Sequence, residues 1–265
     1  DAARAASNGQ GVPVYAPADA ELTALAYYQE GLGQYLLFFE VNCDLTFKLD
    51  HLSTVVEKIR AIAPATPQSG SRTSEVQPRI EFAAGQLIGW AKGALSTGPF
   101  DFGAYDVTHR NTFANQARYE ASYPQELTSV CPYALYDDET RDHFLALLAS
   151  PDATPSQSAD CGSASTDVLG TVAGSWFDPA TLEGVMAVAQ TSSGQIRVVG
   201  DGWSTWVDLG APTNIAPDTV VGVHCYTGRG SWTFLSLHDD GSLRVAHGSG
   251  GCPASLPIGA QTLIR

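Results

Sequence analysis

The chain has 265 residues, of which 44% are hydrophobic, enough for the packed core of one large β domain or two smaller units. Its formal charge of -14 argues against nucleic acid or an anionic membrane surface as the principal partner, because both carry negative charge. No apolar run approaches the roughly 20 residues that a membrane-spanning helix needs, so we expect no membrane insertion.

Residues 1–7 are small, polar and rich in alanine, which is typical of a mature terminus left after removal of a signal peptide. We therefore expect a secreted protein, extracellular or periplasmic. Disulfides form in such compartments, and the spacing of the cysteines in this chain predicts disulfides rather than a zinc site.

The five cysteines include no Cys-x-x-Cys pair of the kind that zinc sites use. The shortest loops pair Cys131 with Cys161 and Cys225 with Cys252. Cys43 is left over, and its apolar neighbours in the sequence predict a small buried side chain rather than a reactive thiol.

Residues 11–107 consist of short β-branched and aromatic runs separated by Gly and Pro, which predicts an antiparallel β unit within a first domain of residues 1–115. Gly33 to Val41 and Leu45 to Leu49 predict a strand pair. Residues 64–78 are polar and rich in Pro, Ser and Gly, so they predict an inserted surface loop.

Residues 116–166 predict a connector that contains one helix. Asp137 and Asp138 precede a run whose apolar residues, between Phe144 and Leu148, recur at helical spacing. Pro151 to Ser165 then predicts a polar linker.

Residues 167–265 predict a second, disulfide-bonded β unit packed with the first. Its clearest element is a hairpin of Trp232 to Leu237 and Leu243 to His247 around an Asp240-Gly241 turn. The whole chain is therefore expected to be mainly β, with antiparallel sheets and a short helix.

Three segments of the first half share their order and spacing with a known family. They are Gly11-Val-Pro-Val-Tyr-Ala-Pro-Ala-Asp19, Phe47-Lys-Leu-Asp-His51-Leu-Ser53 and Ala84-Gly-Gln-Leu-Ile-Gly89. They resemble segments of the lysostaphin-type, or LytM-like, zinc endopeptidases, which cleave peptidoglycan cross-bridges. The resemblance implies a LytM-like β-sheet domain with a groove.

A fourth segment, Ser96-Thr-Gly-Pro-Phe-Asp-Phe102, stands where that family has Ser-Thr-Gly-Pro-His-Leu-His. Phe100 and Phe102 thus replace both histidines, and a phenyl ring cannot bind zinc. The family's remaining ligands, a His and an Asp, belong near residues 1–10, where Asp1 is the only acid and no His occurs. The resemblance therefore implies a pseudoenzyme without a metal site or cofactor.

His51 is the one candidate catalytic residue, as a general base oriented by Asp50. Neighbouring residues on a strand point to opposite faces, which argues against that pairing. Asp101 alternates with Phe100 and Phe102. If those rings occupy the former ligand side, Asp101 faces away, so we expect no replacement metal site with His51.

The candidates for lining the groove are Tyr28, His51, Trp90, Phe100 and Tyr105, where aromatic side chains would bind a sugar, a peptide or a partner protein. Packing in the core is the alternative for each aromatic residue.

Residues 131–265 resemble a narrower group, uncharacterised secreted bacterial proteins in which a degenerate peptidase-like domain precedes a fixed C-terminal extension. The shared marks are Val130-Cys-Pro132, Cys161-Gly162, Asp167-Val-Leu-Gly-Thr171, Gly174-Ser-Trp-Phe177 and Cys252.

We therefore expect an acidic, non-catalytic pseudo-peptidase that acts as a binding or interaction protein at the cell envelope. Its expected partner is a cell-wall or envelope component or another protein. Two alternatives stay open: a metal-dependent hydrolase of peptidoglycan or peptides with ligands from unexpected positions, and a structural surface or assembly protein.

Overall fold

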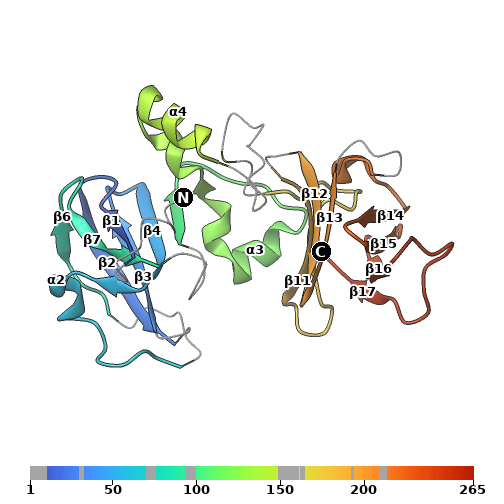
Figure 1. The fold of residues 1–265 in the computed structure, drawn as a ribbon, viewed down its shortest axis with the longest axis horizontal. Helices are drawn as coiled ribbons and strands as arrows, with labels where there is room; N and C mark the ends of the chain where they lie inside the picture. The colour runs from blue at the N-terminus through green and yellow to red at the C-terminus, as the bar shows by residue number, and fades with distance from the viewer. Residues whose placement is uncertain are drawn as a thin grey trace. The chain divides into compact units, whose positions relative to one another are not determined.

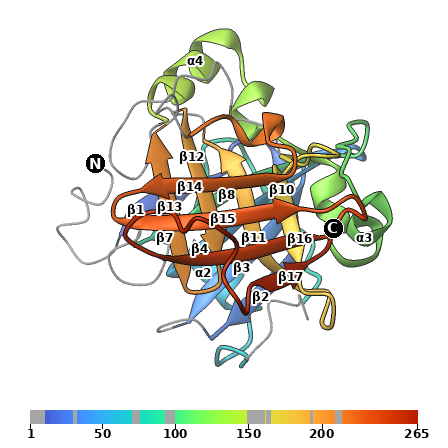
Figure 2. The ribbon, with the colours of Figure 1, turned by 90° about the vertical axis from the view of Figure 1, so that its right-hand side faces the viewer.

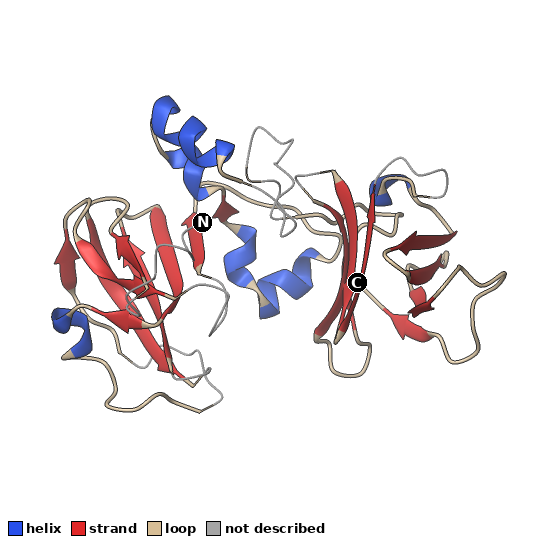
Figure 3. Cartoon of the chain, in the orientation of Figure 1, coloured by secondary structure: helices blue, strands red, loops and turns tan. Residues whose placement is uncertain are grey.

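A computed structural model describes residues 11–29, 33–69, 76–92, 100–148, 161, 165–191, 194–208 and 214–265. The chain forms two compact units (Figure 1): unit 1 comprises Asp1–His109 and Thr128–Pro132, and unit 2 comprises Arg110–Leu127 and Tyr133–Arg265. Strands dominate both units, which confirms the mainly β prediction (Figure 3). The boundaries expected at residues 115 and 166 stay predictions.

Unit 1 is built on a six-stranded antiparallel sheet with the strand order β6-β2-β3-β4-β8-β9. In chain order its strands are β2 (Ala20–Tyr28), β3 (Gln34–Glu40), β4 (Leu45–Leu52), β6 (Ile80–Phe82), β8 (Asp101–Asp106) and β9 (Ser129–Val130). A second, three-stranded sheet has the order β1-β7-β5. It consists of β1 (Val12–Tyr15), β5 (Thr54–Val55) and β7 (Leu87–Ala91), and the short helix α2 (Glu57–Arg60) follows β5.

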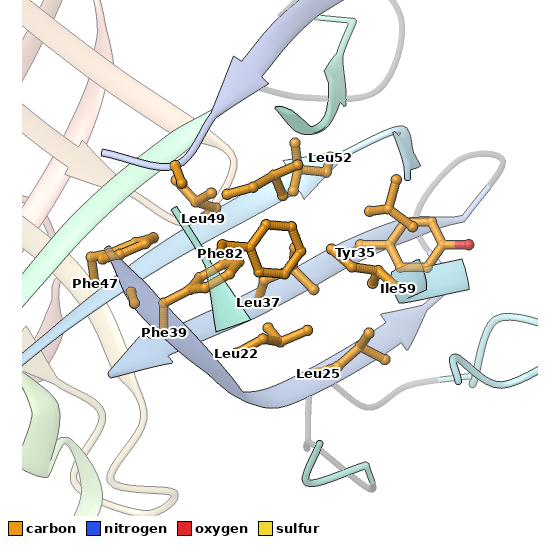
Figure 4. Close-up of a cluster of buried hydrophobic side chains, with 14 residues drawn as sticks. Leu22, Leu25, Tyr35, Leu37, Phe39, Phe47, Leu49, Leu52, Ile59 and Phe82 are labelled. Carbon is orange, nitrogen blue, oxygen red and sulfur yellow. The ribbon is translucent and has the colours of Figure 1, made fainter. Parts of the chain in front are cut away.

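One face of the six-stranded sheet carries the hydrophobic core of unit 1 (Figure 4). Leu37 of β3 pairs in register with Leu49 of β4, and Leu49 pairs with Phe102 of β8. Residues paired across strands share a face, so alternate residues of each strand face this core. Phe39 and Phe47 extend it as a stacked pair with ring centroids 4.6 Å apart.

The β3–β4 hairpin confirms the predicted strand pair and corrects the expectation for Cys43. The Asn42 side chain accepts hydrogen bonds from the backbone N–H groups of Asp44 and Leu45, at 2.8 and 2.9 Å, and so closes the turn. Cys43 lies at this turn as a free, exposed cysteine. The prediction of a buried side chain was wrong because apolar neighbours in sequence belong to the strands and not to the turn itself.

Of the predicted loop at 64–78, the structure describes residues 64–69 and 76–78, while residues 70–75 lie outside the described residues. Gln68 forms a bridge with Tyr28 and Val76 forms one with Leu25, both on β2. The predicted linker from Pro151 to Ser165 lies almost entirely outside the described residues.

Unit 2 holds two four-stranded antiparallel sheets, each a simple meander. The first comprises β10 (Gly174–Phe177), β11 (Gly184–Gln190), β12 (Gln195–Gly200) and β13 (Trp203–Asp208). The second comprises β14 (Val223–Gly228), β15 (Ser231–Leu237), β16 (Leu243–Ser249) and β17 (Gln261–Leu263). Figure 2 shows β14, β15 and β16 crossing the direction of β11, β12 and β13 steeply, as in an orthogonal sheet packing.

Both sheets of unit 2 contribute to one buried cluster. The first sheet contributes Trp176, Val188 and Ile196, and the second contributes Tyr226 and Leu235. All five side chains are fully buried. The predicted hairpin is confirmed as β15 and β16, with Gly241 at a φ of 81° in its turn.

The described helices of unit 2 are short. They are α3 (Gln116–Ser122), α4 (Asp138–Ala146) and the 3-10 turns η1 (Pro124–Leu127) and η3 (Pro217–Thr219), while η2 (Pro132–Leu135) begins at the boundary between the units. The predicted helix is α4, capped by the Asp137 side chain, which accepts from the Thr140 N–H at 2.9 Å. The sequence patterns did not predict α3.

The disulfides follow the predicted pairing. Cys225 and Cys252 are bonded to each other, and Cys131 and Cys161 are both disulfide-bonded. None of the helices in the described residues has the length and apolar character needed to span a lipid bilayer.

Candidate functional site

The face of the six-stranded sheet opposite the core carries a cluster of polar side chains, which we call the outer-face cluster: Tyr28, Gln34, Asp50, His51 and Asp101. Tyr28 pairs in register with Gln34 across β2 and β3, and Asp50 pairs with Asp101 across β4 and β8. Each pair alternates with core residues, which places all four side chains on the outer face.

The Asp50 carboxylate is fixed by two donors. The Tyr28 hydroxyl donates to Asp50 Oδ1 at 2.7 Å, and the backbone N–H of His51 donates to the same oxygen at 2.8 Å. Only 3% of Tyr28 and 1% of Asp50 is exposed. Hydrogen bonds to a buried carboxylate are strong and directional, so these donors hold the carboxylate in one orientation.

A β-bulge brings His51 to the same cluster. Leu37 pairs with Leu49 and Tyr35 with Leu52, so Asp50 and His51 together face the single residue between Tyr35 and Leu37. His51 has a φ of 63°, in the left-handed region. The bulge breaks strand alternation, and the prediction that Asp50 and His51 point to opposite faces was wrong.

The imidazole of His51 is oriented through Nδ1. This atom lies 2.5 Å from Gln34 Oε1 and 3.1 Å from the Tyr28 hydroxyl oxygen. Since the Tyr28 hydroxyl donates to Asp50, its oxygen and the Gln34 carbonyl both suit a proton on Nδ1. The other ring nitrogen, Nε2, then faces Asp101.

Asp101 completes the cluster from β8. Its Oδ2 atom lies 3.6 Å from His51 Nε2, and 44% of its side chain is exposed. Phe100 and Phe102, on either side of it in the sequence, pack against the core of unit 1. The rings therefore occupy the core side, and the expectation that Asp101 faces away from His51 was wrong.

The remaining groove candidates do not join the outer-face cluster. Tyr105 is on the outer face, where its ring tilts against Phe38 with centroids 6.4 Å apart. Trp90 belongs to β7 of the smaller sheet and pairs with Pro13 and Thr54. With Phe100 against the core, only Tyr28 and His51 come together among the five predicted groove residues.

Gln34 was missed in the sequence because nothing in its surroundings marks it as functional. It is fully buried, at 0% exposure, although glutamine usually lies at the surface. Its role follows only from the structure, because the β2–β3 register pairs it with Tyr28 and the bulge on β4 brings His51 Nδ1 to its side-chain oxygen.

Unit 2 has a separate open cleft of about 670 Å³ that the sequence did not predict. Its described lining includes four aromatic and three acidic side chains but no Lys, Arg or His. These are Phe113, Tyr119, Tyr123, Phe177, Glu126, Glu183 and Asp201. Tyr119 stacks on Phe113 with centroids 3.6 Å apart, and burial raises the pKa of its hydroxyl. The cleft suits an uncharged or cationic ligand.

No protein family, no curated protein and no solved structure matches this chain. The resemblance to lysostaphin-type peptidases therefore stays a prediction drawn from the sequence segments.

Proposed function

We propose that the chain is a secreted, non-catalytic pseudo-peptidase that binds a component of the cell envelope. The observation that carries this proposal is the packing of Phe100 and Phe102. These residues stand where the resembling family has two histidines, and both side chains pack against the core of unit 1. The positions that would hold or assist a zinc ion in that family contribute instead to the stability of the sheet.

The pairing of the resembling segments also supports the proposal. The segment that begins at Gly11 forms β1 and pairs with β7, which holds the end of the Ala84 to Gly89 segment. The segment around His51 forms β4 and pairs with β8. These strand pairings would preserve a peptidase-like surface even though phenylalanine replaces both zinc-binding histidines.

The charge of the molecule supports a neutral or cationic partner. The net charge is -14, and the lining of the unit 2 cleft is acidic and aromatic. Asp101 and Tyr105 present a carboxylate and a phenol on the outer face of unit 1. Peptides and sugars with free amino groups fit these surfaces better than anionic polymers do.

Co-sedimentation with purified cell-wall material tests the proposal. We expect the chain to sediment with peptidoglycan, and Tyr105→Ala to weaken binding about 3- to 10-fold through loss of one aromatic contact. Tyr15→Ala is the matched control, because Tyr15 lies on the smaller sheet and is 53% exposed. A chain that stays in the supernatant with every cell-wall preparation contradicts the proposal.

One observation favours a second candidate function, that of a metal-dependent hydrolase. Asp50, His51 and Asp101 each offer a ligand atom, and these atoms lie within 4.8 Å of one another. A hydrolase requires that a metal bound there activates water on a substrate. Release of soluble fragments or new amino groups from peptidoglycan separates this function from binding alone.

A further inference from the structure

We infer that Asp50, His51 and Asp101 form a binding site for a divalent transition metal ion, with Zn²⁺ as the best-fitting example. His51 belongs to one of the segments that resemble the family, but none of the three residues stands where that family has its zinc-binding histidines, which are replaced here by Phe100 and Phe102. The inference does not depend on the proposed envelope-binding function, since a bound metal is compatible with binding and with hydrolysis.

The spacing of the ligand atoms carries the inference. His51 Nε2 and Asp101 Oδ2 lie 3.6 Å apart, which is longer than a direct hydrogen bond. Two ligands that share a tetrahedral zinc at bond lengths of about 2.0–2.1 Å are separated by about 3.3–3.4 Å. The observed distance is therefore close to that of two ligands on one metal. The ligand atom of Asp50 completes a triangle in which all separations are within 4.8 Å.

The surrounding hydrogen bonds orient the His51 imidazole and the Asp50 carboxylate for metal binding. Metal-binding histidines almost always donate their other ring N–H to an oxygen, which fixes the tautomer. Gln34 Oε1, 2.5 Å from His51 Nδ1, provides that acceptor and leaves Nε2 directed at Asp101. The Tyr28 hydroxyl, bonded to Asp50 at 2.7 Å, orients the carboxylate in the same way. The buried residues of the cluster thus form an outer shell around the three ligands.

The donor set indicates the class of metal. One imidazole nitrogen and two carboxylate oxygens suit Zn²⁺ and similar transition metals, whereas Ca²⁺ requires six to eight oxygen ligands. Asp101 is the exposed member of the site, with 44% of its side chain accessible, and it gives an ion a route from solvent. Among the described residues these three are the ligands, and they account for three of the four positions of a tetrahedral metal.

The bound metal would also tie two strands together. Asp50 and His51 belong to β4 and Asp101 to β8, and the Asp50–Asp101 register pair lies at the first residue of β8. A cation between the two carboxylates would offset their mutual repulsion. Metal binding should therefore raise the stability of unit 1.

Zinc binding to the full, tag-free chain tests this site by isothermal titration and by metal analysis after dialysis. We expect one site per chain that Asp101→Asn and His51→Asn each weaken at least 30-fold; asparagine also tolerates the left-handed backbone at residue 51. Asp106→Asn is the control, because Asp106 lies on the same strand and its carboxylate accepts from Thr108. Ca²⁺ and Mg²⁺ at equal concentration should not compete.

A thermal shift gives a second readout. Zinc should raise the melting temperature of the wild type and of Asp106→Asn but not of Asp101→Asn. The Asp101 side chain is 44% exposed and that of His51 only 6%, so Asp101→Asn is less prone to a folding defect than His51→Asn. Zinc retained at full affinity by both Asp101→Asn and His51→Asn overturns the site, as does no binding by a folded wild type. Neither result bears on co-sedimentation with peptidoglycan, so the failure of this site and the failure of the proposed function are distinguishable.

Discussion

The Nε2 atom of His51 faces the Asp101 carboxylate across two paired strands at 3.6 Å, with the Nδ1 atom of the same ring held by Gln34. A β-bulge on β4 produces this relationship, because it turns Asp50 and His51 toward one face. The packing of Phe100 and Phe102 against the core leaves Asp101 on that same face. The bulge and the packing of the two phenylalanines thus bring Asp50, His51 and Asp101 together, whereas regular alternation along β4 would place His51 on the opposite face from Asp50.

Tyr28→Phe tests the hydrogen-bond network beneath His51. The substitution removes the hydroxyl that donates to the buried Asp50 carboxylate at 2.7 Å, and it should lower the free energy of unfolding by about 1.5–3 kcal/mol. Chemical denaturation measures this loss. Tyr15→Phe, at an exposed position, should change stability by less than about 0.5 kcal/mol. Equal effects of the two substitutions would contradict the role assigned to Tyr28.

Phe102→His tests whether the ring fills the core. An imidazole at this position would place polar nitrogens beside Phe47, whose ring meets that of Phe102 edge to face at 6.4 Å. We expect a loss of about 2–4 kcal/mol in unfolding free energy and no gain in zinc affinity. Phe102→Leu, which keeps an apolar side chain, should lose less. A stable Phe102→His variant that binds zinc more tightly than the wild type, or at a second site, would show that the side chain faces the outer side.

The sequence predicts the elements of the fold better than it predicts the site. Alternation and turn residues identify the β3–β4 and β15–β16 hairpins, because each depends on residues close together in the chain. The outer-face cluster depends on a bulge at Asp50 and His51 and on the register between β4 and β8. No short-range pattern encodes either feature, so the expectations that Asp50 and His51 point to opposite faces and that Asp101 faces away from His51 were wrong. Cys43 shows the same limit, since its exposure follows from the turn and not from its apolar neighbours.

The Cys225–Cys252 disulfide closes a loop with a sequence separation of 27 residues. Loop-closure entropy assigns it about 3–4 kcal/mol of stability, so replacing both cysteines with serine should lower the unfolding free energy of unit 2 by that amount. Denaturation followed by tryptophan fluorescence reports on this unit, which contains Trp176, Trp203, Trp206 and Trp232. Cys43→Ser, at the exposed free cysteine, should leave the transition within about 0.5 kcal/mol. A larger effect of Cys43→Ser would point to a role that its exposure does not explain.

Asp240 in the β15–β16 turn should make stability depend on pH at the acid end. The Ser242 hydroxyl and backbone N–H both donate to its carboxylate, at 2.6 and 2.9 Å, and they lower the pKa of Asp240 below its ordinary value. A lowered folded-state pKa contributes stability that is present above the unfolded-state pKa and is lost as the pH falls through the folded value. Asp240→Asn keeps an acceptor oxygen but cannot titrate.

The stability difference between the wild type and Asp240→Asn should therefore be largest above about pH 5 and shrink below about pH 4. Urea denaturation at a series of pH values measures it. Asp239→Asn is the control, since Asp239 is a neighbouring exposed acid in the same turn. A difference that is constant over the acid range would rule out the titration of Asp240 as its source.

The most direct test of the account is to incubate the chain with purified peptidoglycan, with and without added zinc, and to measure sedimented protein and newly released amino groups in the same samples. If the chain is a non-catalytic envelope-binding protein, it sediments with the peptidoglycan while the number of free amino groups stays at the level of the buffer control. A rise in amino groups that His51→Asn abolishes would contradict the non-catalytic claim and establish the outer-face cluster as the active site of a hydrolase.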